Sequence, residues 1–164
     1  MALATAGAIA LLCVHMARVI ALQLHETRGV QPRPVEEAEA LVGGGLTGDS
    51  HAEKQTRALL VVDRAALDAH GLGPGDLREQ VTIEGLPDVT TLPPGTLLRA
   101  GPLTLRVNGE CAPCTHIGGM LAVDDPEAFR VSLRGRRGAL CTVVRADGPI
   151  RVGDDVEVLA PSFA

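Results

Sequence analysis

Apolar and polar residues alternate over short runs along most of this chain, and such runs predict half-buried β-strands. Turn-forming residues separate the runs, including Pro93-Pro94-Gly95 and Asp147-Gly148-Pro149. Many short strands with few helices between them indicate a mainly β fold, a closed or nearly closed β-barrel with a few short helices. The predicted strands cover residues 17–25, 57–62, 79–85, 96–101, 103–109, 139–147 and 154–160.

Helical patterns are confined to a few short segments. Asp63 can cap a helix over residues 64–71. Residues 35–42 are predicted to form a short helical or turn segment, and further short helices are expected within residues 114–134. The chain therefore lacks the long, regularly spaced helices of a parallel α/β sheet.

The first fifteen residues differ from the rest because residues 2–14 are almost uniformly apolar. This run is too short to span a bilayer, and no Lys or Arg precedes it as a secretory signal requires. We therefore expect residues 1–15 to be an apolar extension outside the core and residues 16–164 to form a single domain, with Met1 or Met16 as the natural start. A signal peptide stays open as the alternative.

The composition argues against binding to nucleic acid. The chain has 164 residues, enough for one domain with its own core. Its net charge is −5, it has no Trp or Tyr, and its aromatic residues are Phe129 and Phe163. Nucleic-acid binding depends on positive charge and often on aromatic stacking, so it is not expected. Arg134, Arg136 and Arg137 form one basic cluster, which we expect in a solvated loop.

The candidate chemistry lies in NGECAPCTHIGG, residues 108–119, where Cys111, Cys114 and His116 fall close together. The other cysteines are Cys13 and Cys141, and four cysteines so unevenly spaced do not form a disulfide framework. We therefore expect reduced thiols in a cytoplasmic protein, with no membrane association.

Three kinds of site need partners for these cysteines. A c-type haem site requires histidine directly after the second cysteine, but Thr115 intervenes, so haem is excluded. Zinc could be held by the two cysteines with His116 and His51, yet a structural zinc site usually has a second compact ligand pair, which this chain lacks. A dithiol redox pair prefers a βαβ context. Zinc and dithiol chemistry are therefore disfavoured.

A single functional thiol is the remaining chemical interpretation. Pro113 fixes the turn before Cys114, and the next residues can start a helix whose free N–H groups would favour the Cys114 thiolate. A structural role for both cysteines, as half-buried residues at a strand end, stays open on this segment alone.

A glycine-rich loop provides a second candidate site. Gly43, Gly45 and Gly48 match the spacing G-x-G-x-x-G, but a dinucleotide site needs a strand before these glycines and a helix after them. Neither is predicted here. We interpret the loop as a tight turn that delivers Asp49 and His51 to a fixed place.

Five segments follow one another in a recognisable order: LTGDSHA at 46–52, Arg57 before an apolar strand, PGDLREQVTIEGLP at 74–87, LPPGTLLRAGPLTLRVNG at 92–109 and APC at 112–114. Taken in this order, they resemble the MOSC domain, which is the C-terminal domain of molybdenum cofactor sulfurases and also occurs in stand-alone relatives. The likeness runs from about residue 17 to 159, and the family's β-barrel agrees with the predicted strands.

The resemblance assigns roles to individual residues. The family's cysteine corresponds to Cys114, which follows Pro113, and Cys111 is an additional thiol. The acidic loop residue corresponds to Asp49, and the arginine that starts a strand corresponds to Arg57.

The family's Gly-Glu-Asn-Ile-Thr segment corresponds to REQVT in this chain. Glu79 and Thr82 are kept, whereas Arg78 replaces Gly and Gln80 replaces Asn. These departures put the loop conformation and the amide contact in question. Ser50 stands where many relatives have arginine, which removes one potential contact to an anion.

The resemblance implies a molybdenum-pterin cofactor with Cys114 as a molybdenum ligand, or sulfur carried on Cys114 for metal–sulfur cofactor chemistry. A soft thiolate suits both roles. Arg57 would hold a pterin phosphate, and His51 or His116 could move a proton near neutral pH. The implied cofactor-binding residues are Asp49, His51, Arg57, Glu79, Gln80, Thr82 and His116.

Two classes of function stay open. One is an enzyme, either a molybdenum-dependent reductase of N-hydroxylated compounds or a sulfur transferase, and the other is a non-catalytic carrier. A reductase would need an electron-donor protein, since the chain has no flavin or iron–sulfur motif, and a carrier would need a cofactor or sulfur donor. Full-length sulfurases also use pyridoxal phosphate, but this chain lacks that domain, and Lys54 lies in a polar loop.

Overall fold

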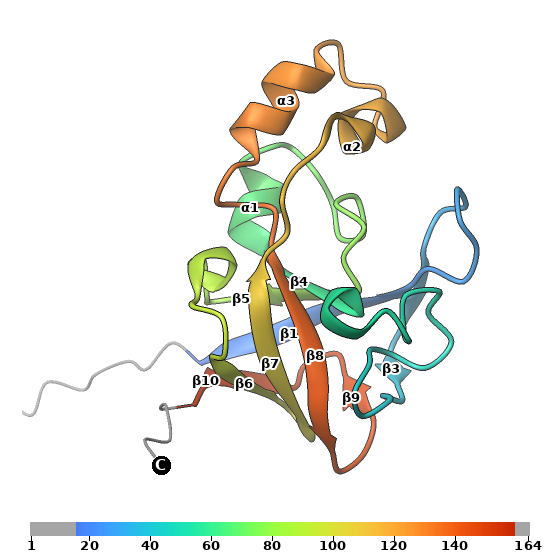
Figure 1. Cartoon of the computed structure of the whole chain (residues 1–164), viewed down its shortest axis with the longest axis vertical. Coiled ribbons are helices and arrows are strands. Elements are labelled where there is room, and N and C mark those ends of the chain that lie inside the picture. Colours follow the sequence, from blue (N-terminus) through green and yellow to red (C-terminus); the bar gives the residue numbers. More distant parts are fainter. Residues whose placement is uncertain (1–15, 160–164) are drawn as a thin grey trace, which may run out of the picture.

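The structure is a computed structural model that describes residues 16–159, so the expectations for residues 1–15 lie outside the described part of the chain (Figure 1). The strands are β1 (Ala17–Leu24), β2 (Arg33–Val35), β3 (Glu37–Ala38), β4 (Leu59–Asp63), β5 (Val81–Glu84), β6 (Leu97–Ala100), β7 (Leu103–Glu110), β8 (Ala139–Ala146), β9 (Ile150–Arg151) and β10 (Asp155–Val158). The helices are α1 (Arg64–Asp68), α2 (Thr115–Met120) and α3 (Pro126–Ser132), with 3₁₀ turns η1 (Gln55–Arg57) and η2 (Val89–Thr91).

Seven of these strands form one closed ring (Figure 1). Their order is β1, β10, β6, β7, β8, β4 and β5, and β5 pairs again with β1. Closure falls between β1 and β10, where Ala17 lies opposite Val156 and Arg18 opposite Asp155. The prediction of a mainly β protein, a closed barrel with a few short helices, is therefore confirmed.

One neighbouring pair in the ring, β4 and β5, is parallel, while the others are antiparallel. A parallel pair needs a crossover connection, and here it carries α1. Asp63 caps α1 by accepting a hydrogen bond from the Ala65 N–H at 2.8 Å, as its position in the sequence predicts. Its second oxygen accepts the Leu86 N–H at 2.8 Å, so one carboxylate connects the start of α1 to the chain that leaves β5.

The barrel interior is filled by aliphatic side chains that alternate along the strands with outward-facing residues. Along β7, for example, Leu103, Leu105 and Val107 are buried while Arg106 is exposed. The largest fully buried side chains in this interior are Leu22, Leu46, Leu59, Ile83, Leu98, Leu103, Leu105 and Ile150.

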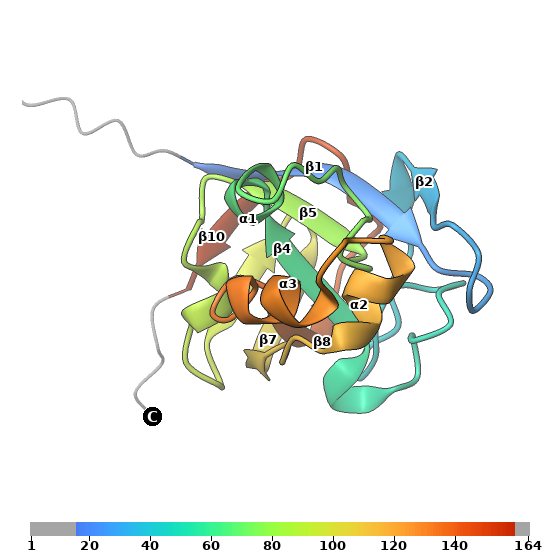
Figure 2. The same cartoon turned by 90° about the horizontal axis from the view of Figure 1, so that it is seen from above.

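A second apolar cluster joins the helices to one end of the barrel (Figures 1 and 2). It combines Leu67 of α1, Ile117 of α2 and Leu133 after α3 with Leu60 and Val62 of β4. This cluster fixes the start of α2 against the barrel. All three helices are short, and in the described part of the chain none is long and apolar enough to cross a membrane.

Two segments differ from their sequence-based predictions. The helical prediction for residues 35–42 is wrong, because β2 pairs with β1 and β3 pairs with β9. Arg57 does not start a strand; it ends η1, and β4 begins at Leu59. In both cases pairing with distant strands sets the boundary, and a local pattern does not contain that information.

Replacement of a core leucine measures how much stability the barrel interior contributes. Leu105→Ala should lower the free energy of unfolding by about 2–5 kcal/mol, because the removed atoms leave a cavity among side chains that relax only in part. The matched variant Leu41→Ala alters an exposed leucine and should change it by less than about 1 kcal/mol. Urea unfolding measures both, and equal losses would contradict the described burial.

Candidate functional site

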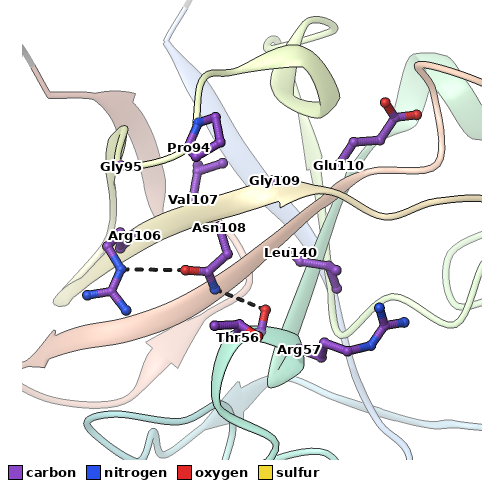
Figure 3. A pocket seen from close by; sticks show the side chains of 10 residues that line it. All are labelled: Thr56, Arg57, Pro94, Gly95, Arg106, Val107, Asn108, Gly109, Glu110 and Leu140. Carbon is purple, nitrogen blue, oxygen red and sulfur yellow. Dashed lines mark hydrogen bonds between the residues drawn. The ribbon is translucent and has the colours of Figure 1, made fainter.

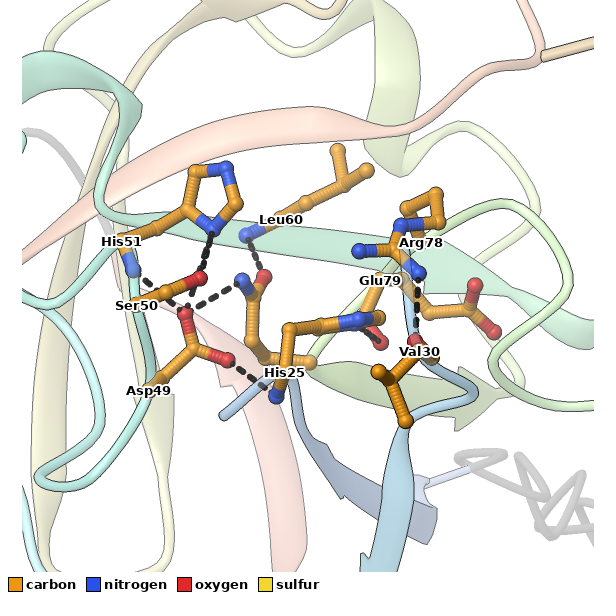
Figure 4. A network of polar contacts seen from close by, with 9 residues as sticks. His25, Val30, Asp49, Ser50, His51, Leu60, Arg78 and Glu79 are labelled. Carbon is orange, nitrogen blue, oxygen red and sulfur yellow. Dashed lines mark hydrogen bonds and ion pairs between the residues drawn. The ribbon is translucent and has the colours of Figure 1, made fainter. Parts of the chain in front are cut away.

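Asp49 is buried and joins three separate segments of the chain (Figure 4). Its Oδ2 accepts the backbone N–H of His25 at 2.7 Å, and its Oδ1 accepts the backbone N–H of His51 at 2.8 Å. The Gln80 side-chain amide donates to Oδ1 at 3.2 Å. A buried carboxylate needs such donors, so Asp49 fixes the glycine loop against the end of β1 and the start of β5.

Gln80 uses both ends of its amide within the protein. While its Nε2 donates to Asp49, its Oε1 accepts the backbone N–H of Leu60 at 2.8 Å. The longer Gln side chain, which replaces the family's Asn, therefore connects Asp49 to β4. Gln80 positions the site, because its hydrogen-bonding groups are already occupied.

Glu79 is fully buried beside His25. Its Oε1 accepts the Gly75 N–H at 2.7 Å and the Thr82 hydroxyl at 2.8 Å, and its backbone carbonyl lies 3.2 Å from the His25 Nε2. The Glu79 Oε2 and the His25 Nδ1 have no hydrogen-bonding partner among residues 16–159. Burial raises the pKa of Glu79, against the opposing effect of the Gly75 and Thr82 hydrogen bonds.

Two histidines form one side of this network. The His25 and His51 rings meet edge to face with centroids 6.5 Å apart. Burial lowers the pKa of His25, the hydrogen bond to Glu79 opposes that shift, and the Arg78 charge lowers the pKa further. Burial also lowers the pKa of His51, with Lys54 adding to the effect. Both imidazoles are therefore uncharged near neutral pH.

Arg78 occupies the position where the MOSC resemblance expects glycine. Its φ is +66°, in the left-handed region that favours glycine. The loop therefore keeps a glycine-like conformation although the residue is arginine, which answers the question raised by this departure. The Arg78 Nη1 donates to the Val30 carbonyl at 3.3 Å, and its charge faces the two histidines (Figure 4).

The cysteines of the CAPC segment have different surroundings. Cys111 is buried, its N–H donates to the Gly138 carbonyl at 2.9 Å, and its Sγ accepts from the Arg137 Nη1 at 3.1 Å. Arg137 is only 8% exposed and also donates to the Leu77 carbonyl at 3.0 Å. The prediction that Arg137 lies in a solvated loop is therefore wrong; it connects the cysteine segment to the segment that leads into Glu79.

Cys114 is exposed at the N-cap position of α2, and its side chain makes no capping hydrogen bond. Cys141 is buried within the barrel, and burial raises its pKa to about 12. Of the cysteines in the described residues, Cys114 alone is exposed. Its thiol is therefore the one that a ligand or a partner reaches without a rearrangement of the core.

Two surface hollows border the segment from Glu110 to Pro113, which leads to Cys114. The first, which we call the η1–β7 hollow, has a volume of about 520 Å³ and is lined by Arg57, Arg106 and Glu110 (Figure 3). The second, the Pro113 hollow, has a volume of about 390 Å³ and is lined by Glu110, Pro113 and Arg134. Because Glu110 lines both, the two hollows are neighbours.

The structure thus divides the candidate residues into two groups. Asp49, His51, Glu79, Gln80 and Thr82 belong to one hydrogen-bonded network. In the described residues, Arg57, Cys114 and His116 make no hydrogen bond or ion pair with that network; Arg57 lines the η1–β7 hollow, and exposed His116 lies in the first turn of α2.

Sequence reasoning missed His25 and Arg137. His25 is held by Asp49 and Glu79, and Arg137 is held by Leu77. These partners are far away along the chain, so no local sequence pattern identifies either residue. Within residues 16–159, no three His, Cys, Asp or Glu side chains are grouped so that they could hold a metal ion by themselves.

The protein is thus a closed β-barrel domain that presents an exposed cysteine at the start of a helix at one end of the barrel. The sequence matches the MOSC domain over residues 48–157, and the chain belongs to this family. A search of curated proteins finds no match.

Solved structures with the same fold include the YUAD protein from Bacillus subtilis and YiiM from Escherichia coli. The YUAD protein is 23% identical, with a TM-score of 0.77 over 87% of this chain and 95% of its own. YiiM is 18% identical, with a TM-score of 0.63 over 88% of this chain and 70% of its own. YiiM from Geobacillus stearothermophilus is 16% identical, with a TM-score of 0.66 over 90% of this chain and 77% of its own. At these identities the likeness shows a shared fold.

Two substitutions of Arg78 separate the effect of its backbone conformation on stability from the effect of its charge on the histidine pKa values. Both Arg78→Gly and Arg78→Ala should raise the pKa values of His25 and His51, because a nearby positive charge disfavours a protonated imidazole. Only glycine also relieves the positive φ, so the Gly variant should be more stable than the Ala variant by about 1 kcal/mol. NMR titration of the histidines and urea unfolding test the two effects. Unchanged histidine pKa values, or an Ala variant as stable as the Gly variant, would contradict this account.

Proposed function

We propose that this MOSC protein uses Cys114 as its working thiol, either to bind the molybdenum of a molybdenum-pterin cofactor or to carry sulfur for metal–sulfur cofactor chemistry. The observation that carries this proposal is the contrast among the thiols of the described residues: Cys114 is exposed, while Cys111 and Cys141 are buried. A metal or a donor persulfide must reach the sulfur atom directly, and only an exposed thiol allows this without rearrangement.

The residue types proposed for this site suit a molybdenum-pterin cofactor. Such a group would supply a redox-active metal, and a thiolate is a soft ligand of the kind that it accepts. Arg57, whose guanidinium has no carboxylate partner among the described residues, is available for a phosphate group. His116 is exposed and lies two residues after Cys114, and this proximity in the chain supports a role in proton transfer near the thiol.

The buried network contributes to the site indirectly, by holding the loops from which the cysteine segment is supported. The hydrogen bonds of this network go mainly to backbone N–H groups and to other members of the network, which are Asp49, Gln80 and Glu79. Their role is therefore to hold the loops that form the end of the barrel. Arg137 continues this support to the cysteine segment, because it binds both Leu77 and Cys111. We assign these residues as positioning residues rather than as ligands.

Sulfur carriage is the second form of the proposal, and the exposure of Cys114 favours it equally. To take up sulfur, the Cys114 thiolate attacks the outer sulfur of a donor persulfide. The donor's S–S bond breaks, a new S–S bond forms on Cys114, and the donor leaves as a thiolate. A carrier of this kind needs a donor protein and hands the same sulfur on to an acceptor.

Cysteine variants test the assignment directly. Cys114→Ser should abolish cofactor or persulfide loading, and Cys111→Ser should retain most of it. Loading is measured as molybdenum and pterin content of protein purified from a molybdenum-replete host, and as persulfide by mass spectrometry after incubation with a persulfide donor. Iodoacetamide should alkylate Cys114 before Cys111, since only Cys114 is exposed.

The same two variants, Cys114→Ser and Cys111→Ser, also show which results would contradict the assignment. Full loading in the Cys114→Ser protein would remove the proposed thiol from the function. Loss of loading in Cys111→Ser alone, with the fold retained by circular dichroism, would move the site three residues upstream.

A further inference from the structure

The arginines of this protein are unevenly paired with acidic side chains. Seven of them form ion pairs with glutamate or aspartate, and one of these is Arg130 of α3, which pairs with Glu127 on its own helix and lines the Pro113 hollow. Arg28 and Arg78, which lie outside both hollows, form no ion pair with the described residues. The arginines found in ion pairs are Arg18, Arg33, Arg64, Arg99, Arg130, Arg145 and Arg151.

Of the arginines in or beside the two hollows, Arg130 alone forms such a pair within the described residues. Arg57 and Arg106 line the η1–β7 hollow, Arg134 lines the Pro113 hollow, and exposed Arg136 follows two residues later. Glu110, the acidic residue that lines both hollows, is partly committed, because its Oε1 accepts the Gly135 N–H at 2.7 Å. In a chain of net charge −5, four unpaired arginines therefore lie in or next to the two hollows that border the segment leading to Cys114.

The two hollows are shallow. Most residues that line the η1–β7 hollow, including Thr56, Pro94 and Glu110, are exposed, and Figure 3 shows Arg57 and Arg106 toward opposite sides of it. A site for a small molecule usually encloses most of its ligand. A shallow surface with separated charges fits the side chains of a second protein better.

The same surface offers an apolar contact. Val131 of α3 is 44% exposed, and its carbonyl accepts the Arg134 N–H at 3.2 Å, so the last turn of α3 brings an exposed valine next to an unpaired arginine. Protein interfaces commonly combine apolar contacts with a charged rim that steers the partner into place.

We propose that the surface formed by Arg106, Arg134, Arg136 and Val131 is a docking site for a protein that presents acidic side chains beside Cys114, while Arg57 keeps the role given to it in the proposed function. This inference rests on the proposed function, because a working thiol at Cys114 needs a protein that exchanges electrons, cofactor or sulfur with it. The positive charge raises the rate of encounter with an acidic protein and orients its carboxylates toward the two hollows.

The test uses a fluorescein-labelled octaglutamate peptide as the acidic probe and fluorescence anisotropy as the measurement. The wild-type protein should bind the peptide at about 25 mM salt and lose most of the binding at about 250 mM, where screening acts over a much shorter distance. The Arg106→Glu/Arg134→Glu variant should bind it at least about tenfold more weakly. The control Arg28→Glu/Arg145→Glu has the same net charge but alters residues outside both hollows, and should change the affinity by about twofold at most.

A second measurement locates the peptide. Bound octaglutamate should slow the alkylation of Cys114 by iodoacetamide in the wild type and in the control, but not in Arg106→Glu/Arg134→Glu. Equal affinity of the two double variants would overturn the docking site. Saturable binding of inorganic pyrophosphate that displaces the peptide and is lost in Arg106→Glu/Arg134→Glu would also overturn it, because these two arginines would then hold a small anion.

Loading of Cys114 in the same preparations separates this proposal from the proposed function. Arg106 and Arg134 belong to neither the thiol nor its support, so Arg106→Glu/Arg134→Glu should accept sulfur from a small-molecule persulfide as the wild type does, because that donor needs no docking surface. Normal loading with unchanged peptide binding would refute the docking surface alone. Absence of loading from the wild type, with peptide binding as expected, would refute the proposed function and leave the acidic-binding surface established.

Discussion

The candidate site depends on one buried carboxylate. Asp49 lies in a loop that turns at Gly48, whose φ of +89° suits glycine, and it accepts hydrogen bonds from the end of β1, from its own loop and from Gln80. A buried charge without donors would be strongly unfavourable, so these segments cannot move apart independently. The barrel supplies the strands, and Asp49 fixes how the loops at their ends meet.

The two cysteines of the CAPC segment show how a fold separates residues only three positions apart. Cys111 faces the apolar cluster under the helices and accepts a hydrogen bond from Arg137, whereas Cys114 begins α2 and stays in solvent. Arg137 connects this segment to Leu77, and the following residues lead to Glu79. The exposed thiol therefore stands on a segment whose inner side is held by the same parts of the chain that hold the buried network.

The sequence predicts the parts of this structure that local patterns determine. Alternation and turn residues locate the barrel strands, and Asp63 marks the start of α1 because capping involves residues close in the chain. Residues 35–42 and Arg57 were placed wrongly because the pairing of strands far apart in the sequence decides where the elements around them begin and end. His25 and Arg137 were missed since their burial comes from partners 24 to 60 positions away.

Closure of the ring between β1 and β10 has a consequence for the synthesis of this protein. Ala17 and Arg18 of β1 pair with Val156 and Asp155 of β10. The ring therefore cannot close until β10, near the end of the chain, has been synthesised. All residues assigned to the site leave the ribosome earlier. A nascent chain that ends before Asp155 therefore contains the complete set of thiols, histidines and carboxylates, yet lacks the strand that completes the barrel holding them.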